Sequence, residues 1–299
     1  SEGGTYYQTE LALTAENLQN IVGLFNSSLA SEAVDVIVDV SVNGKAPRNS
    51  PALFALSLAS ACPDVRVRQK ALKSVPLVAR TGSDLFQYVS YVQTMRGWGR
   101  SLRRAIRAWY TGQTPEALAY QLIKYRQRYG FTHKDLISLS HPKWPGSAHE
   151  ELGSWIMKGV LPTGDTKAAE LIRAFHHVQK AKDVNAAVSL MREYKLPWET
   201  LPTKLLREPT IWRTMLSWMP MTALLRNLAR MSAIGVMEDP DAVDQVCERL
   251  RPEILTAARI HPIQLLIGWF SYQAGQGLRG KLQWKPNEAI TKALEKAFY

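Results

Sequence analysis

Lysine, arginine and aromatic side chains are concentrated in one stretch, residues 96–143, and these residue types together are suited to binding a polyanion. The stretch, called here the basic segment, holds ten Lys and Arg against two Asp and Glu, although the whole chain has a net charge of only +11. Its cations are interleaved with the aromatic residues Trp109, Tyr110, Tyr120, Tyr125, Tyr129 and Phe131. A solvated helix face normally mixes both signs of charge, so this pattern indicates a nucleic-acid surface.

Lys124 and Arg128 are the two cations whose spacing suits phosphate binding most directly. We predict a helix with Thr114 as its N-cap and Pro115 at its first position, ending at Gly130, which can adopt the left-handed C-terminal conformation. On this helix Lys124 and Arg128 would lie one turn apart on one face, where they could span adjacent backbone phosphates. The expected buried stripe is Leu118, Leu122, Tyr125 and Tyr129.

Two further helices are predicted on either side of this one. The first has apolar residues at i, i+3, i+4 and i+7, which define one buried face. These residues are Leu102, Ala105, Ile106 and Trp109, and the opposite side carries Arg100, Arg104 and Arg107. The second helix begins after Thr132, where Asp135 is a candidate capping-box partner, and Pro142 ends it directly after His141.

Several stretches resemble, in order, the TROVE module of the Ro autoantigen family. They are GWGRSLRRAIRAWY (97–110), IKYRQRYGFTHKDLISLSH (123–141), MPMTALLRNLARMSA (219–233), ARIHPIQLLI (258–267) and GQGLRGKLQWKPNEAI (275–290), with SEGGTYY at the very start. The resemblance implies an all-α fold of HEAT-like helical repeats curved into a ring. It also implies small noncoding Y RNAs bound on the outer surface, and single-stranded ends of misfolded RNAs bound in the central hole.

The resemblance carries particular residue roles with it. Lys124, Arg128 and His141 match the residue types that contact Y RNA in the family. We expect the same outer surface to include Arg100, Arg104, Arg107, Arg126, His133 and Lys134. Candidates for the central hole are Arg226, Asn227, Arg230, Arg259, His261, Arg279 and Lys281. For the first three the alternative is an ordinary amphipathic helix, whereas Arg279 or Lys281 could approach an RNA phosphate from a glycine loop.

The remaining helices are predicted from caps and periodicity over residues 14–26, from Pro51 onward, and over 64–79, 165–182, 183–195 and 210–218. Residues 34–42 place Val at every second position, a pattern typical of a strand. We nevertheless expect a helix there, because Ser31 and Glu32 form a plausible start and the family resemblance implies one. No fixed repeat period is visible, which favours divergent HEAT-like pairs.

The sequence contains little that indicates catalysis, metal binding or cofactor binding. The chain has no Walker loop, GxSxG elbow or paired-carboxylate motif. Gly275, Gly277 and Gly280 spell GxGxxG, but a helical pattern precedes them, whereas a dinucleotide site needs a strand there. DVSVN at 39–43 resembles a metal-binding loop by chance, and the adjacent His176 and His177 cannot both face one metal from a helix. We expect no enzyme activity and no cofactor.

Residues 1–299 are expected to form one TROVE-like domain without the von Willebrand factor A domain of full-length family members. Leu294, Phe298 and Tyr299 would then lie at an unprotected end and favour self-contact. Expected partners are Y-like RNA, single-stranded RNA ends, and an exoribonuclease such as polynucleotide phosphorylase tethered through RNA. Two widely spaced cysteines and the absence of a long apolar run favour a cytoplasmic protein. The alternative is a protein-binding helical scaffold whose basic face is incidental.

Overall fold

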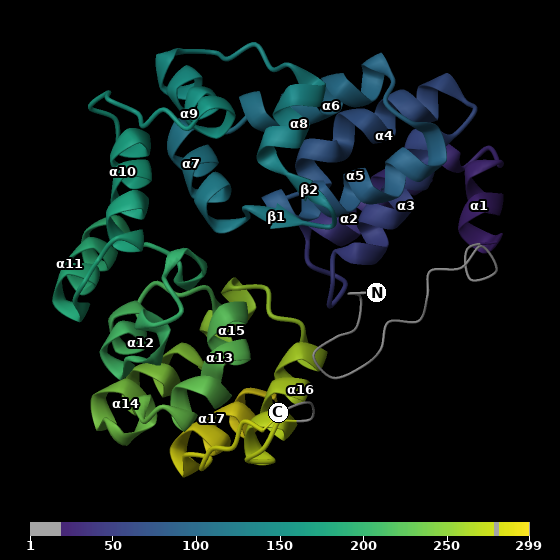
Figure 1. The fold of residues 1–299 in the computed structure, drawn as a ribbon. Helices are drawn as coiled ribbons and strands as arrows, with labels where there is room; N and C mark the ends of the chain where they lie inside the picture. The colour runs from purple at the N-terminus through teal and green to yellow at the C-terminus, as the bar shows by residue number, and fades with distance from the viewer. Residues whose placement is uncertain (1–18, 278–280, 299) are drawn as a thin grey trace. The chain divides into compact units, whose positions relative to one another are not determined.

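The computed structural model describes residues 19–277 and 281–298, and these residues are almost entirely helical (Figure 1). The predicted all-α class is therefore confirmed. None of the described helices is long and apolar enough to cross a membrane. The chain divides into two compact units, with the boundary between Phe175 and His176, inside α10 (Lys167–Gln179). The prediction that the repeats close into a ring remains a prediction.

The amino-terminal unit contains the basic segment. Its helices are α1 (Gln19–Phe25), α2 (Ala30–Val42), α3 (Ser50–Ala61), α4 (Val65–Val78), α5 (Gly82–Arg96), α6 (Arg100–Thr111), α7 (Pro115–Lys124), α8 (His133–Ser140) and α9 (Ser147–Lys158). In this unit α3 packs on α4 and α5, α4 on α6, and α6 on α8. The fully buried side chains of Tyr88, Phe86 and Tyr110 fill the space between these helices.

The carboxy-terminal unit is built from short helices and 3₁₀ turns. Its α-helices after α10 are α11 (Val184–Tyr194), α12 (Pro209–Met215), α13 (Met221–Ala233), α14 (Pro240–Arg249), α15 (Pro252–Ala257), α16 (Pro262–Gln273) and α17 (Glu288–Phe298). The 3₁₀ turns are Trp198–Thr200, Leu205–Arg207 and Val236–Glu238. Here α16 packs on α13 and α17, around the buried Tyr272 and Ile290.

Several predicted helix starts are confirmed by side-chain caps. Asp64 accepts a hydrogen bond from the Arg66 amide at 2.7 Å, and Thr114 accepts one from the Ala117 amide at 3.2 Å. Such caps satisfy amide donors that have no partner inside the helix. The predicted start at Thr14 lies outside the described residues, whereas the rest of that helix is found as α1.

Residues 30–42 form helix α2 in spite of the alternating valines. Ala30, Ala33 and Val34 are buried at the spacing i, i+3, i+4, whereas Val36 is 59% exposed. The burial pattern is therefore helical, because small alanines complete a face that valines alone would not form. The expectation of a helix here is confirmed.

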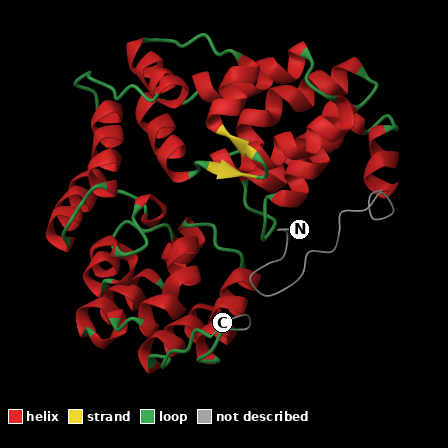
Figure 2. Cartoon of the chain, viewed as in Figure 1, coloured by secondary structure: helices red, strands yellow, loops and turns green. Residues whose placement is uncertain are grey.

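The helix predicted to run from Thr114 to Gly130 is wrong in its second half. Helix α7 ends at Lys124, and a two-stranded antiparallel hairpin follows, formed by β1 (Gln127–Arg128) and β2 (Phe131–Thr132). Figure 2 shows this hairpin as the yellow arrows among the red helices. Lys124 and Arg128 are consequently not one turn apart on a common helix face.

The end of α17 also differs from the expectation of exposed apolar residues. Leu294 is fully buried, and the Phe298 ring lies 6.4 Å from the Trp269 ring, centroid to centroid. Tyr299 lies outside the described residues. These two side chains already pack within their own unit, so they provide no support for self-association.

Candidate nucleic-acid interface

The hairpin that follows α7 is held by a two-residue turn, Tyr129–Gly130. Both residues have positive φ angles, 52° and 79°, as a type I′ turn requires. Glycine adopts such angles at little cost, whereas tyrosine does so less readily. The turn pairs Arg128 directly with Phe131, so both side chains project from the same face of the hairpin.

Helix α6 places a second group of cations on the surface of the same unit. Leu102 and Ile106 are fully buried and Ala105 and Trp109 nearly so, as predicted, which leaves the opposite side of the helix to arginines. The exposed arginines are Arg100, Arg103 and Arg104. Gly99 precedes them as an N-cap without a capping side chain, and the first turn has no acidic residue. A positive helix end that also carries arginines favours a bound anion.

The acidic residues of the basic segment do not neutralise these cations. Asp135 is engaged at the start of α8, where its carboxylate accepts hydrogen bonds from the Thr132 amide at 2.8 Å and from the Thr132 hydroxyl at 2.7 Å. Ion pairs with other described residues are absent for the exposed cations Arg100, Arg103, Arg104, Arg126, Arg128 and Lys134. Their charges therefore remain available to an external anion.

Lys124 is half-buried and packs against two tyrosines. Its Nζ lies 5.2 Å from the centre of the Tyr120 ring and 5.4 Å from that of Tyr125, and it donates to the Tyr120 hydroxyl at 3.3 Å. Contacts of this kind hold a cation in one orientation. Arg126 is exposed, with its guanidinium 5.7 Å from the centre of the Phe175 ring.

The end of α8 carries His141 and, one residue earlier, a backbone carbonyl that Arg107 binds. His141 is exposed and has a left-handed φ of 48°, and its amide donates to the Ile137 carbonyl at 2.9 Å. Arg107 is half-buried and donates from Nη2 to the Ser140 carbonyl at 2.9 Å. The guanidinium of Arg107 therefore binds the backbone carbonyl next to His141, and the prediction that Arg107 contacts RNA remains a prediction.

His133 does not belong to the outer surface, and this prediction was wrong. Its side chain is only 2% exposed, and Nδ1 lies 2.9 Å from the Tyr110 hydroxyl. The ring also stacks on Trp109, with centroids 6.1 Å apart. Burial lowers the pKa of His133 to about 3, so the ring is neutral at physiological pH. A buried, neutral imidazole is neither accessible to a phosphate nor charged to attract one.

The residues predicted for a central hole differ in burial: some are buried and others are exposed. Asn227 is buried, and its amide donates to the Ala223 carbonyl at 2.8 Å, so its assignment to a hole is corrected to the core. Arg230 is half-buried, with its guanidinium 5.5 Å from the centre of the Trp212 ring. Both residues stabilise α13 and its neighbours. Arg226 and Lys281 are exposed, and Arg279 lies outside the described residues.

Arg259 and His261 lie just before α16. Arg259 is exposed, with a left-handed φ of 54°. The His261 ring accepts a hydrogen bond from the Ile263 amide at 3.2 Å and so caps α16. The helix that precedes Gly275 excludes the strand that a dinucleotide motif needs, as the sequence pattern predicted.

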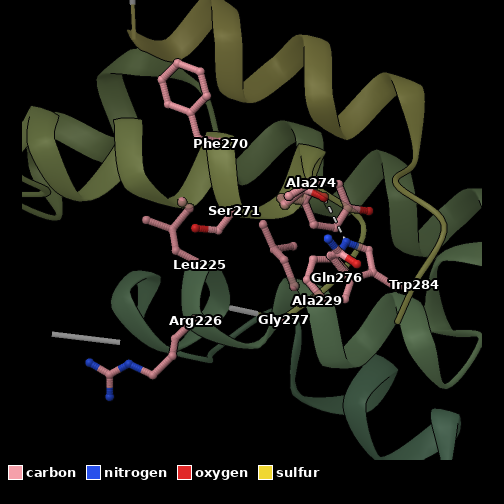
Figure 3. A pocket seen from close by; sticks show the side chains of 12 residues that line it. Leu225, Arg226, Ala229, Phe270, Ser271, Ala274, Gln276, Gly277 and Trp284 are labelled. Carbon is pink, nitrogen blue, oxygen red and sulfur yellow. Dashed lines mark hydrogen bonds between the residues drawn. The ribbon is translucent and has the colours of Figure 1, made fainter. Parts of the chain in front are cut away.

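A pocket of about 160 Å³ lies between α13, α16 and the loop after α16 (Figure 3). Its wall is mostly apolar, with Leu225 and Ala229 from one side and Phe270 and Trp284 from the other. The Arg226 guanidinium points away from the Phe270 side. Trp284 is fixed by a hydrogen bond from its indole to the Tyr272 carbonyl at 2.8 Å.

Two surface features were missed by sequence reasoning. Arg103 is exposed on α6 beside Arg104, although the pattern of one arginine per turn did not single it out. Trp98 lies in the loop before α6, and its ring contacts that of Phe131 at 6.3 Å between centroids. The flanking glycines, Gly97 and Gly99, were the available signal, because they place a large side chain in an otherwise open loop.

The arrangement described above, helices with exposed cations in the basic segment and one two-stranded sheet among the described residues, defines an all-α protein with a basic face. The TROVE domain family matches residues 9–196 and 188–269. The chain belongs to this family, and the resemblance predicted from the motifs is confirmed.

Relatives extend the comparison over the whole chain. A Deinococcus radiodurans protein named RNA-binding protein RO60 is 34% identical over 301 residues, covering 99% of this chain and 56% of the relative. A Caenorhabditis elegans protein of the same name is 29% identical over 376 residues, covering 100% of this chain and 58% of the relative. The crystal structure of the Deinococcus radiodurans RO (RSR) protein matches with a TM-score of 0.80 and 34% identity, over 99% of this chain and 60% of that one. The chain therefore spans less than two thirds of each.

Proposed function

We propose that this chain is a noncatalytic RNA-binding protein whose basic segment holds the backbone phosphates of a small structured RNA. One observation carries the proposal: the exposed cations on α6, the hairpin and the start of α8 have no ion-pair partner among the described residues, while Asp135 is used as a helix cap. Exposed cations without ion-pair partners release bound counterions from the phosphates that they contact, and this release dominates binding to nucleic acids. The names of the two relatives point to the same ligand class.

The finer assignments follow from the family resemblance. The proposed ligand on the outer surface is a Y or Y-like noncoding RNA, and a second ligand is the single-stranded end of a misfolded RNA. The corresponding role is noncoding RNA quality control in the cytoplasm, with an exoribonuclease recruited through the bound RNA.

The test is RNA affinity against salt, measured by fluorescence anisotropy with a labelled small stem-loop RNA. Arg128→Ala and Lys134→Ala should each weaken binding and lower the slope of log affinity against log salt by roughly one unit per lost phosphate contact. His141→Ser should weaken binding with little change in slope, because we expect the imidazole to act mainly by hydrogen bonding or stacking.

Arg192→Ala, which removes an exposed arginine of α11, is the matched control and should change neither quantity. Binding that is weak and independent of salt in the unaltered protein would instead favour the scaffold alternative. Unchanged RNA length after incubation would agree with a noncatalytic role, whereas shortened RNA would contradict it.

A further inference from the structure

We propose that Trp98 and Phe131 form a platform on which one unpaired RNA base stacks, between two phosphate-binding groups. The inference rests on the proposed function and adds a ligand feature to it: a nucleotide that is not base-paired, next to a stem. It concerns the loop before α6 and the hairpin tip, which lie in the same unit.

The hairpin fixes one side of the platform. In the register Arg128 opposite Phe131, the two side chains share a face of the ribbon. Directly opposed residues in an antiparallel pair have Cβ atoms about 5 Å apart, which is close enough for one nucleotide to contact both side chains. The hairpin packs on α5, so its position does not depend on the ligand.

Trp98 completes the platform from the adjacent loop. Its ring meets that of Phe131 at an interplanar angle of 67°, an edge contact that leaves a ring face uncovered by the pair. Both residues are half-buried, so they are anchored in the protein and still reach solvent. Gly97, with a φ of 67°, lets the chain leave α5 sharply enough to place the indole there.

The start of α6 supplies the second phosphate-binding group. Gly99 follows Trp98 directly and is the N-cap of a twelve-residue helix without a capping side chain. Arg100 is the first residue of that helix and is exposed. Phe131 is therefore paired with Arg128 in the hairpin, and Trp98 is followed directly by the positive helix end with Arg100.

This chemistry selects an unpaired nucleotide over a paired one. Bases inside an A-form helix are stacked on each other and present no face to a protein ring, whereas bases in bulges, loops and ends can be splayed out and stacked on aromatic side chains. Two cationic groups on either side would hold the phosphates that flank the displaced base. A stem with a bulge or an adjoining single strand meets both conditions.

The experiment compares three RNA probes: a stem-loop with one bulged adenosine, the same RNA with an abasic residue at the bulge, and a fully paired stem. Trp98→Leu and Phe131→Leu should weaken binding of the bulged RNA by about 5-fold to about 150-fold, the range expected for loss of one base stack. Binding of the abasic and paired RNAs should be nearly unchanged, and the salt slope should stay the same for all three. Trp98→Phe should restore most of the affinity.

Phe270→Leu is the matched control, because it removes a 59% exposed aromatic ring from α16 and should leave all three affinities unchanged. Equal losses for bulged and abasic RNA in the Trp98 variants, or no loss at all, would overturn the inference. If a leucine variant fails to fold, the affinities of the unaltered protein and of Trp98→Phe for bulged and for abasic RNA provide the test. Equal affinities for the two RNAs would contradict base stacking. Salt-dependent RNA binding without discrimination between the probes would refute the platform alone, whereas no binding to any probe would refute both proposals.

Discussion

His133 and His141 lie eight residues apart in the basic segment, yet they have opposite environments. His141 ends α8 in an exposed left-handed conformation, whereas His133 is enclosed by Phe86, Trp109 and Tyr110. The packing is tight enough that a Cβ added to Gly82 would meet the His133 ring at 3.0 Å. The same residue type thus serves stability at one position and remains available for binding at the other.

The buried histidine makes stability depend on pH. Burial lowers the pKa of His133 to about 3 in the folded protein, while the unfolded chain has the ordinary value of 6.5. Between pH 6.5 and pH 3 the His133 imidazole is protonated in the unfolded state but neutral in the folded state. The free energy of unfolding therefore falls as the pH decreases below 6.5. The free energy of unfolding should drop by about 2 kcal/mol from pH 7 to pH 5 through this group.

Denaturant unfolding of His133→Gln at both pH values is the check. The variant should be less stable at pH 7, because the Tyr110 hydroxyl loses its partner, but its stability should fall less on acidification. Identical pH dependence in the two proteins would show that His133 is not the group responsible.

At the scale of elements, the hairpin depends on a glycine in a conformation that other residues avoid. Gly130 has a φ of 79° and open space around it, so an added methyl group meets no neighbour and the cost of Gly130→Ala is purely conformational. We expect a loss of about 1–2 kcal/mol, localised to the hairpin. RNA affinity should fall as well, because the turn sets the pairing of Arg128 with Phe131.

Gly23→Ala is the matched control for this substitution. Gly23 also has no atom near its added Cβ, but it lies within α1 and has no positive φ. Alanine there should stabilise the helix slightly and leave RNA affinity unchanged. Thermal unfolding and anisotropy of both variants separate the two effects, and equal behaviour would argue against the turn geometry.

The elements that local chemistry determines were predictable from the sequence, and those that tertiary packing determines were not. The helix starts at Asp64, Thr114 and Thr132 follow from side chains that reach amides two or three residues away. The end of α7 was missed because Tyr125 and Tyr129 continue the apolar stripe of Leu118 and Leu122 at helical spacing. The turn lacks the Asn-Gly or Asp-Gly pair that usually marks a two-residue hairpin.

The candidate site shows the same division. The charge of the basic segment and the exposure of Arg128, Lys134 and His141 agree with the sequence prediction. The assignments of His133 and Asn227 failed, because a polar residue type does not say whether the fold buries it. The glycines on either side of Trp98 mark it as a loop residue in the sequence, but its contact with Phe131, 33 positions later, is visible only in the structure.

At the scale of the whole molecule, cations in the carboxy-terminal unit allow a second RNA contact to be tested. Arg226 and Lys281 are exposed, whereas Arg230 is held against Trp212. If the exposed pair contacts a threaded strand, replacing both with Ala should weaken capture of a stem with a single-stranded 3′ tail more than capture of the stem alone. The flexible tail is the part that can follow a narrow channel.

Lys296→Ala, an exposed cation of α17, is the control for this pair. Anisotropy with tailed and blunt RNAs gives the comparison. Equal losses for both RNAs would indicate one continuous basic surface, and no loss would return Arg226 and Lys281 to the role of solvated surface residues.

The hairpin also has a consequence for the number of RNA molecules that one chain binds and for the position at which each RNA lies on the surface. Stacked helices present similar ridges again and again, and a ligand bound to such a surface could shift by one repeat without losing contacts. Among the described residues β1 and β2 form the only sheet, and Gln276 and Gln283 form one isolated antiparallel bridge, so the pairing of Arg128 with Phe131 occurs once there. We expect an RNA that engages the surface around Arg128 to bind in one register, so titration with a small stem-loop RNA without a single-stranded tail should saturate at one molecule per chain.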